Sequence, residues 1–235
     1  MTLTVESLHA TLAPWCKAAR WTVGLSGGLD SCLLLSLLAE LRQANVDAMP
    51  PLAAIHVDHQ LHPDSPRWAE HCAALCDALG VPLETVAIEV DPATGGPEAA
   101  ARDARYQVFE SRLGADEVLL LAHHSDDQVE TFFLRLMRGA GTRGLSGMPA
   151  SRALGAGSLL RPLLAYSRAD LERCAGERGL SWVEDPSNAL QDADRNFLRQ
   201  TLLPQLATRW PGYRQSVMSS MEALGDAEQL LGPLD

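Results

Sequence analysis

Residues 23–31 read Val23-Gly-Leu-Ser-Gly-Gly-Leu-Asp-Ser31, an apolar run that ends in a glycine pair and then turns polar. The apolar residues 21–25 have the character of a strand, and the leucine-rich residues 31–44 have that of a helix. Two adjacent glycines allow tight or left-handed backbone, so consecutive amides can point at one anion, which a helix start also attracts. A plain tight turn would explain the glycine pair, but not the serines and aspartate beside it. The segment therefore predicts a phosphate-binding loop between a strand and a helix.

The same alternation continues along the chain. Strands are predicted at residues 21–25, 52–57, 83–88 and 118–122, and helices at residues 4–18, 31–44, 66–79, 98–113 and 126–138. Strands alternating with helices of this length indicate βαβ units, and therefore an α/β fold with a doubly wound, mostly parallel, Rossmann-like sheet. Residues 139–147 are glycine-rich and predict a loop. A small helical extension is expected to follow, with helices at residues 168–178, 195–208 and 213–231.

The composition is that of an ordinary globular protein. The 235 residues are 46% hydrophobic and 21% charged, which excludes wholesale disorder, collagen and a coiled coil. The net charge of -11 argues against a protein that coats nucleic acid nonspecifically, because that role needs positive charge. The charge is uneven, however, since residues 135–214 carry twelve arginines and seven acidic residues, a net of +5. The acidity therefore excludes only broad nonspecific binding.

The cysteines predict a reducing compartment. There are five, an odd number, and no two have the Cys-x-x-Cys spacing of redox and zinc motifs. Cys72 and Cys76 lie one turn apart on an alanine- and leucine-rich helix, which favours the core over a metal site. The N-terminus lacks a signal-peptide pattern, and the longest nearly apolar run, residues 32–39, is far short of the ~20 residues of a membrane helix. We therefore expect a cytoplasmic protein with no membrane partner.

The serine-glycine loop is not a Walker loop, because it lacks the Gly-x-x-x-x-Gly-Lys-Ser/Thr pattern. It resembles the PP-loop of the N-type ATP pyrophosphatases, which cleave ATP to AMP and pyrophosphate and so adenylate an oxygen. The resemblance implies ATP as cosubstrate, with its phosphates on Ser26, Gly27, Gly28, Leu29, Asp30 and Ser31. It also implies a catalytic role for Asp30 as the Mg²⁺ ligand near the departing pyrophosphate, since hard oxygen ligands suit Mg²⁺.

Further strings narrow the acceptor of the adenylate. They are Ile55-His-Val-Asp-His59, Ala101-Arg-Asp-Ala-Arg-Tyr106, Ala122-His-His-Ser-Asp-Asp-Gln-Val-Glu-Thr131, Arg161-Pro-Leu-Leu164, Glu184-Asp-Pro-Ser-Asn188 and Arg195-Asn-Phe-Leu-Arg199. In order and spacing, from about residue 21 to residue 199, they resemble the tRNA(Ile)-lysidine synthase family. That resemblance implies adenylation at C2 of the wobble cytidine in a CAU-anticodon isoleucine tRNA. The side-chain amine of free L-lysine would then displace AMP.

Three polar residues are expected at the carboxyl end of the second strand, beside the phosphate loop. His56, Asp58 and His59 could contact the nucleotide or the adenylated base there, and the resemblance makes them catalytic. Ordinary loop capping is the alternative. The glycine that usually follows this string in the family is Gln60 here, so the approach of this loop to substrate is expected to differ.

Two carboxylates are expected on one face of the helix that starts near residue 126. Asp127 and Glu130 are three residues apart with no arginine or lysine adjacent, and the resemblance makes them the lysine-binding pair. Complementation of the helix dipole is the alternative, with Ser125 and Gln128 as a capping box.

The remaining candidates are basic. The resemblance places Arg195 in a segment that closes over the active site, as a catalytic residue; the alternative is a surface ion pair with Asp192 or Asp194. The segment 139–144 matches Gly-x-Gly-x-x-Gly but follows a helix, so it predicts a flexible loop rather than a dinucleotide site. RNA or phosphate contacts are expected from Arg102, Arg105, His123, His124, Arg143 and Arg199. A solvated helix face is the alternative for the first two.

The resemblance also divides the chain by role. We expect a PP-loop core at residues 1–150, a substrate-closing continuation of the catalytic domain at 151–208, and a helical linker at 209–235. In the family such a linker leads to C-terminal tRNA-binding domains, so a trimmed catalytic portion and a short natural form both fit the end at Asp235. The oligomeric state is open, with a homodimer as one alternative.

Other functions fit the residues less well. A tRNA thiolase of the same superfamily is the nearest alternative, but those enzymes commonly use paired cysteines, often Cys-x-x-Cys, which this chain lacks. An amidotransferase synthetase needs an ammonia source, and 235 residues leave no room for a glutaminase domain. A noncatalytic adenine-nucleotide-binding module, from a different class, would keep the glycine loop without needing Asp30, Asp127 and Glu130 together.

Overall fold

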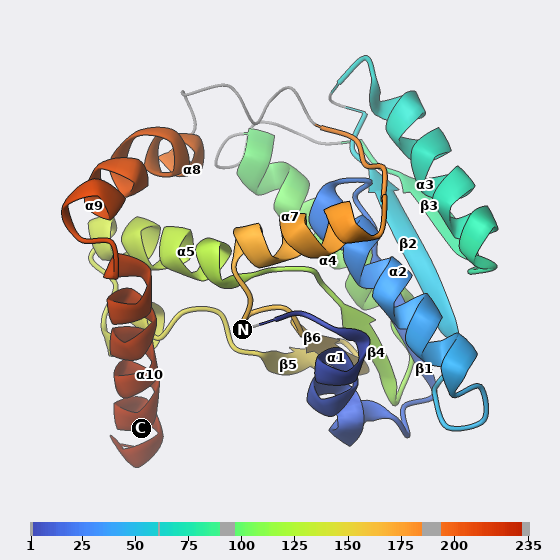
Figure 1. Ribbon diagram of the computed structural model, residues 1–235, viewed down its shortest axis with the longest axis horizontal. Coiled ribbons are helices and arrows are strands. Elements are labelled where there is room, and N and C mark those ends of the chain that lie inside the picture. Colours follow the sequence, from blue (N-terminus) through green and yellow to red (C-terminus); the bar gives the residue numbers. More distant parts are fainter. Residues whose placement is uncertain (1, 61, 90–96, 185–193, 232–235) are drawn as a thin grey trace. The chain divides into compact units, whose positions relative to one another are not determined.

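The computed structural model describes residues 2–60, 62–89, 97–184 and 194–231, which form two compact units (Figure 1). The first unit comprises Met1–Ala122 and Ala150–Glu184, and the second comprises His123–Pro149 and Asp185–Asp235. Each unit is therefore built from two separate stretches of chain. The roles predicted for residues 1–150, 151–208 and 209–235 are functional. The division into two compact units does not test them, so they stay predictions.

The first unit contains one six-stranded sheet with the order β3-β2-β1-β4-β6-β5. Its strands are β1 (Arg20–Gly24), β2 (Leu52–Asp58), β3 (Leu83–Ala87), β4 (Glu117–Leu120), β5 (Ser151–Leu154) and β6 (Gly157–Leu160). Neighbouring strands are parallel except β5 and β6, so the predicted α/β fold with a mostly parallel sheet is confirmed. The sequence did not predict β5 and β6. They are only four residues each, and three of the four residues of β5 are exposed, so neither carries a strong apolar signal.

Helices cover both faces of this sheet. They are α1 (Val5–Leu12), the 3-10 turn η1 (Ala13–Trp15), α2 (Leu29–Ala44), α3 (Ser65–Leu79), α4 (Pro97–Arg112) and α7 (Arg168–Glu177). One core cluster joins α1, α2, α3 and α7 to residues such as Trp21 and Val23 of β1. The other joins Phe109 of α4 to Ile55 and Val57 of β2. Helix α4 and helix α2 therefore pack on opposite faces of the sheet.

The cysteines of α3 belong to the first of these clusters. Cys72 and Cys76 are buried, as the helical spacing predicted, and burial raises the pKa of the Cys72 thiol to about 12. The burial of both side chains supports the packing interpretation of these cysteines.

The second unit is helical. It contains α5 (Ser125–Met137), α6 (Thr142–Leu145), α8 (Asp194–Phe197), the π-helical turn η3 (Leu198–Leu202), α9 (Leu203–Arg209) and α10 (Tyr213–Leu231). Its core joins Val129 of α5 to Leu198 and Leu203. The predicted loop at residues 139–147 is wrong in part, because residues 142–145 form the turn of helix α6. In the described part of the chain, no helix combines the length and the apolar character that a membrane span requires.

Candidate phosphate loop and acidic cluster

The phosphate loop joins β1 to α2 and is held in shape by its own polar groups. The Ser26 backbone N–H donates to Ser31 Oγ at 3.1 Å, and Ser31 Oγ donates to the Gly28 carbonyl at 3.1 Å. Gly27 has a φ of +85°, and a side chain added there would approach Cys72 Sγ at 3.3 Å, so the position requires glycine. Gly28 is the N-cap of α2 and provides no side-chain hydrogen bond to its first amides. The helix start therefore keeps the geometry that binds an anion.

Asp30 lies in the first turn of α2 and contacts an arginine that the sequence did not suggest. Nη1 of Arg168, the first residue of α7, donates to both carboxylate oxygens of Asp30, at 2.7 and 2.8 Å. The Asp30 side chain is 27% exposed, so both a solvent path and an ionic partner are present. A carboxylate of this kind suits Mg²⁺, which usually combines one or two protein carboxylates with substrate phosphates and waters. The residue therefore fits the expected metal, in competition with Arg168.

His56 supports the phosphate loop from β2. Its side chain is buried, Nδ1 lies 2.8 Å from the Leu25 carbonyl oxygen, and Cys72 Sγ lies 3.6 Å from the same nitrogen. Leu25 is the last residue before the Ser-Gly-Gly string, so this contact fixes the entry into the loop. His56 therefore occupies a position that orients the loop backbone.

The end of β2 is shaped by Asp58, His59 and Gln60. The Gln60 backbone N–H donates to Asp58 Oδ1 at 2.9 Å, and Gln60 itself has a φ of +53°. Glutamine thus occupies a left-handed position that favours glycine, the residue usual there in the family. Burial, helped by the nearby charge of Arg105, lowers the pKa of His59 to about 4, and its Nδ1 has no hydrogen-bond partner among the described residues. His59 is therefore neutral at neutral pH.

The acidic cluster lies at the start of α5. His124 is the N-cap, and its backbone N–H donates to the Asp127 carboxylate at 3.0 Å. The predicted capping box of Ser125 and Gln128 is wrong by one residue, because the helix begins one residue earlier than expected. Gln128 instead exchanges two hydrogen bonds with the backbone of Met148, at 2.7 and 2.8 Å. Burial disfavours the charged form of Asp127, but His124 and His123 outweigh it, and the pKa of Asp127 falls below its usual value.

Glu130 is the most enclosed member of the cluster. Its side chain is 1% exposed, and Arg199 holds it with a fork, Nε to Oε1 at 2.7 Å and Nη2 to Oε2 at 3.0 Å. Arg195 Nε lies 3.4 Å from Oε2 of the same carboxylate, and Arg199 lies 3.9 Å from Asp127. Burial raises the pKa of Glu130, although Arg199 opposes that shift. The sequence places no arginine or lysine next to Asp127 and Glu130. The fold, however, brings Arg195 of α8 and Arg199 of η3 to this pair.

The other basic candidates are dispersed. Of the two acids proposed as surface partners of Arg195, Asp194 lies 3.8 Å from Arg138 instead, and Asp192 lies outside the described residues. Arg143 is exposed on α6. Because α6 is only four residues long, the Gly-x-Gly-x-x-Gly match does not lead into a helix of the length found in dinucleotide sites. Arg102 and Arg105 lie on α4 in the first unit, where Arg102 packs over Tyr106.

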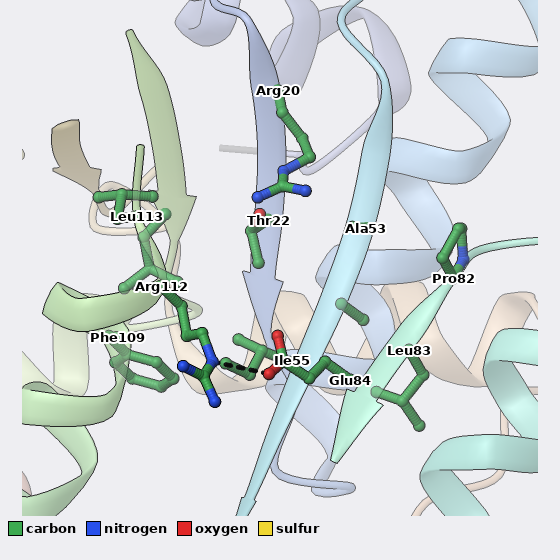
Figure 2. Close-up of a pocket in the computed structure, with 12 residues that line it drawn as sticks. Arg20, Thr22, Ala53, Ile55, Pro82, Leu83, Glu84, Phe109, Arg112 and Leu113 are labelled. Atoms are coloured by element: carbon green, nitrogen blue, oxygen red, sulfur yellow. Dashed lines mark hydrogen bonds and ion pairs between the residues drawn. The ribbon is translucent and has the colours of Figure 1, made fainter. Parts of the chain in front are cut away.

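A separate pocket lies on the α4 face at the amino-terminal side of the sheet (Figure 2). Arg20, Thr22 and Ile55 line it, and an ion pair from Arg112 Nε to Glu84 Oε1, 2.7 Å long, crosses it (Figure 2). Ligands of open α/β sheets bind outside the carboxyl ends of the strands. This pocket is at the other end of the strands from the phosphate loop and is not the nucleotide site.

The family match and the similar proteins agree on one family for this chain. Residues 1–206 match the model of the PP-loop domain family. The chain is 52% identical over 228 residues to the tRNA(Ile)-lysidine synthase of Pseudomonas syringae pv. tomato, covering 97% of this chain and 50% of that protein. It is 44% identical over 235 residues to the protein of the same name from Methylococcus capsulatus, covering 100% of this chain and 52% of that protein. The chain thus spans about half the length of these curated relatives.

A solved structure supports the fold alone. The U34-tRNA thiolase NcsA from Methanococcus maripaludis superposes with a TM-score of 0.75 at 18% sequence identity, covering 94% of this chain and 76% of that one. The family match, by contrast, includes the loop between β1 and α2, the end of β2 and the acidic cluster. The chain therefore belongs to the PP-loop domain family.

Proposed function

We propose that this chain ligates L-lysine to C2 of the wobble cytidine of a CAU-anticodon isoleucine tRNA, at the expense of ATP. In the first step the cytidine O2 attacks the α-phosphate of ATP, and pyrophosphate leaves. In the second step the ε-amine of lysine attacks C2, the C–O bond to AMP breaks, and the amine loses a proton. The name of both relatives, tRNA(Ile)-lysidine synthase, supports this reaction.

The observation that carries the proposal is the pair of enclosed carboxylates at the start of α5. The side chains of Glu130 and Asp127 are 1% and 14% exposed, and Arg199 lies within ion-pair distance of both. The pair thus already binds a cation, and the α-ammonium group of the lysine substrate would bind it in exchange for an arginine.

The phosphate loop supplies the other half of the reaction. Its amides and the start of α2 would hold the ATP phosphates, with Ser26 and Ser31 fixing the loop. Asp30 would hold Mg²⁺, which neutralises the charge that develops on the departing pyrophosphate. His56 keeps the loop entry in place, and His59, neutral at neutral pH, offers an uncharged imidazole to the nucleotide or the base. Arg195 would act as a further catalytic residue, and residues 151–208 would close over the substrate.

The experiment supplies the chain with ATP, labelled lysine and a CAU-anticodon tRNA(Ile), and measures label in RNA and release of pyrophosphate. We expect both, and neither with a matched tRNA whose wobble cytidine is replaced by uridine. Asp30→Asn should abolish both signals, whereas Asp103→Asn, an exposed charge change on α4, should leave them unchanged. Absence of label in RNA from a chain that binds ATP would overturn the proposal, and ATP binding without pyrophosphate release would favour a noncatalytic nucleotide-binding module. Mass measurement in solution would determine whether the chain is a monomer or a homodimer.

A further inference from the structure

Four arginines surround one tyrosine in the first unit. Arg102 and Arg152 place their guanidinium carbons 5.3 and 5.4 Å from the centre of the Tyr106 ring. Nη2 of Arg161 donates to the Tyr106 hydroxyl at 3.5 Å, and Arg105 acts on the same hydroxyl through its charge. These five residues are called the Tyr106 cluster. They come from α4, from β5 and from the end of β6, so only the fold brings them together.

The cluster concentrates positive charge where burial makes it expensive. Arg161 is 4% exposed, and burial lowers its pKa, with Arg152 and Arg102 acting in the same direction. Burial disfavours the charged form of Tyr106, yet the pKa of its hydroxyl falls below its usual value because Arg102, Arg161 and Arg105 outweigh burial. Like charges held together in a partly buried place cost stability, a cost that functional sites tolerate. An anion bound here would interact favourably with the guanidinium groups of the cluster.

The cluster lies at the edge of the sheet where ligands bind. Arg161 directly follows Leu160, the last residue of β6, and β6 runs parallel to β4. Arg152 pairs with Leu159 in the antiparallel β5, which brings it to the same end of β6. Arg105 also lowers the pKa of His59, which follows the carboxyl end of β2. The Tyr106 cluster is therefore at the carboxyl edge of the sheet, on the face that α4 covers.

This placement separates the cluster from the phosphate loop. The loop leads into α2, which packs in the core of the opposite face, and its backbone amides and the start of α2 form a separate anion-binding geometry. Arginine forks, by contrast, match the oxygens of a phosphodiester and accommodate a flexible backbone. Arg152 and Arg161 also fall within residues 135–214, the stretch whose net charge is +5 in an otherwise acidic chain.

We propose that the Tyr106 cluster is a second anion site, which binds a phosphodiester group of the RNA substrate. The inference rests on the proposed function, because it takes RNA as the ligand. The Tyr106 ring holds the guanidinium groups of Arg102 and Arg152 in place, and the buried Arg161 adds positive charge next to the Tyr106 hydroxyl. The cluster thus positions the RNA backbone and contributes no atom to the adenylation itself.

The test measures binding of a CAU-anticodon stem-loop RNA at several salt concentrations, and of ATP separately. Arg102→Gln and Arg152→Gln remove exposed arginines of the cluster, so the fold is expected to stay intact. Each should weaken RNA binding roughly fivefold to tenfold and reduce the slope of log affinity against log salt by about 0.7 to 0.9, the value for one phosphate contact. ATP affinity should not change. Arg112→Gln is the control, since it removes the same charge from the same helix at the opposite edge of the sheet.

Three results would overturn the inference. They are unchanged RNA affinity and salt slope in both cluster variants, a loss of ATP affinity in place of RNA affinity, and no RNA binding by the unsubstituted chain. Failure of the proposed function looks different: the unsubstituted chain would bind RNA through these arginines but attach no lysine to it. Conversely, lysine attachment with normal RNA binding by both variants would leave the function standing and remove the cluster from it.

Discussion

The ion pair between Glu130 and Arg199 should stabilise the second unit measurably. The perturbation is Arg199→Gln, which leaves a shorter, polar side chain and removes the charge and the fork. Among the described residues, Glu130 would then keep Arg195 as its basic partner, whose Nε is 3.4 Å from the carboxylate. We expect a loss of stability that is larger than that of an ordinary surface pair, because one partner is almost fully buried.

The size of the expected loss of stability depends on how exposed the Glu130 and Arg199 side chains are. Removing one partner of a fully buried pair costs about 3–5 kcal/mol, and a hydrogen bond to a charged group contributes about 1.5–3 kcal/mol. Glu130 is 1% exposed but the Arg199 side chain is 43% exposed, so water compensates for part of the loss. The expected cost is about 2 kcal/mol. In a double-mutant cycle with Glu130→Gln, we expect a coupling energy of about 1.5 kcal/mol, since the double variant removes both charges of this pair.

Hydrogen exchange of the α5 amides measures this locally. A loss of about 2 kcal/mol corresponds to roughly thirtyfold faster exchange, because 1.4 kcal/mol is a factor of ten. Arg173→Gln is the matched control, as it breaks an exposed arginine–aspartate pair on α7 and should change stability by under about 1 kcal/mol. A coupling energy below about 0.5 kcal/mol between positions 130 and 199 would refute the reasoning.

Three further predictions concern the first unit. The His59 imidazole should titrate near pH 4 by NMR; since the unfolded group binds protons below its ordinary pKa of about 6.5, stability should fall as the pH drops from about 6.5 to 4, and His59→Gln should weaken this fall. Arg168→Gln should remove one competing contact of Asp30 and lower the Mg²⁺ concentration for half-maximal ATP binding about tenfold, as expected for loss of a competing charged hydrogen bond. Gln60→Gly should raise the unfolding free energy by about 0.5–1 kcal/mol, because relief of left-handed strain exceeds the added entropy of glycine.

Two of these predictions have a control variant, and each has an outcome that would contradict it. His62→Gln replaces a neighbouring histidine and should leave the fall in stability between pH 6.5 and pH 4 in place; a His59 midpoint near pH 6.5 would contradict the prediction. Unaltered Mg²⁺ dependence in Arg168→Gln would mean that Arg168 does not compete for Asp30. For the backbone prediction, Gln107→Gly in the middle of α4 should destabilise by about 1 kcal/mol, the opposite sign; destabilisation by Gln60→Gly would refute the strain argument.

The periodic parts of the fold could be predicted from sequence. The apolar strands β1, β2 and β4 and the helices α2 and α5 follow from runs and spacing that reflect burial in the sheet layers. The hairpin of β5 and β6 could not be, because its first strand is mostly exposed and the turn between them holds Gly155 with a φ of +55°. The true cap of α5, His124, was missed because histidine is an uncommon capping residue.

The partners within the site were beyond sequence reasoning. Asp30, Asp127 and Glu130 are visible as motif residues, but Arg168 is 138 residues from Asp30 and Arg199 is 69 residues from Glu130. No local period links residues so far apart, since such pairs depend on how helices pack. The Tyr106 cluster likewise combines residues from α4 with residues near positions 152 and 161. Sequence patterns therefore predict which acids belong to the site, but not which arginine pairs with each acid.

The division of each unit into two stretches of chain has a consequence for synthesis. Helix α5 leaves the ribosome long before Leu198 and Leu203 can cover Val129, and Arg199 follows Glu130 by 69 residues. At about 5–20 residues per second, that interval lasts roughly 3–14 seconds. The sheet and α7 are complete by Glu184, 15 residues before Arg199, so the first unit can begin to fold about 1–3 seconds before Arg199 is added, while the apolar face of α5 stays available to chaperones. We therefore expect the phosphate loop to assemble before the acidic cluster.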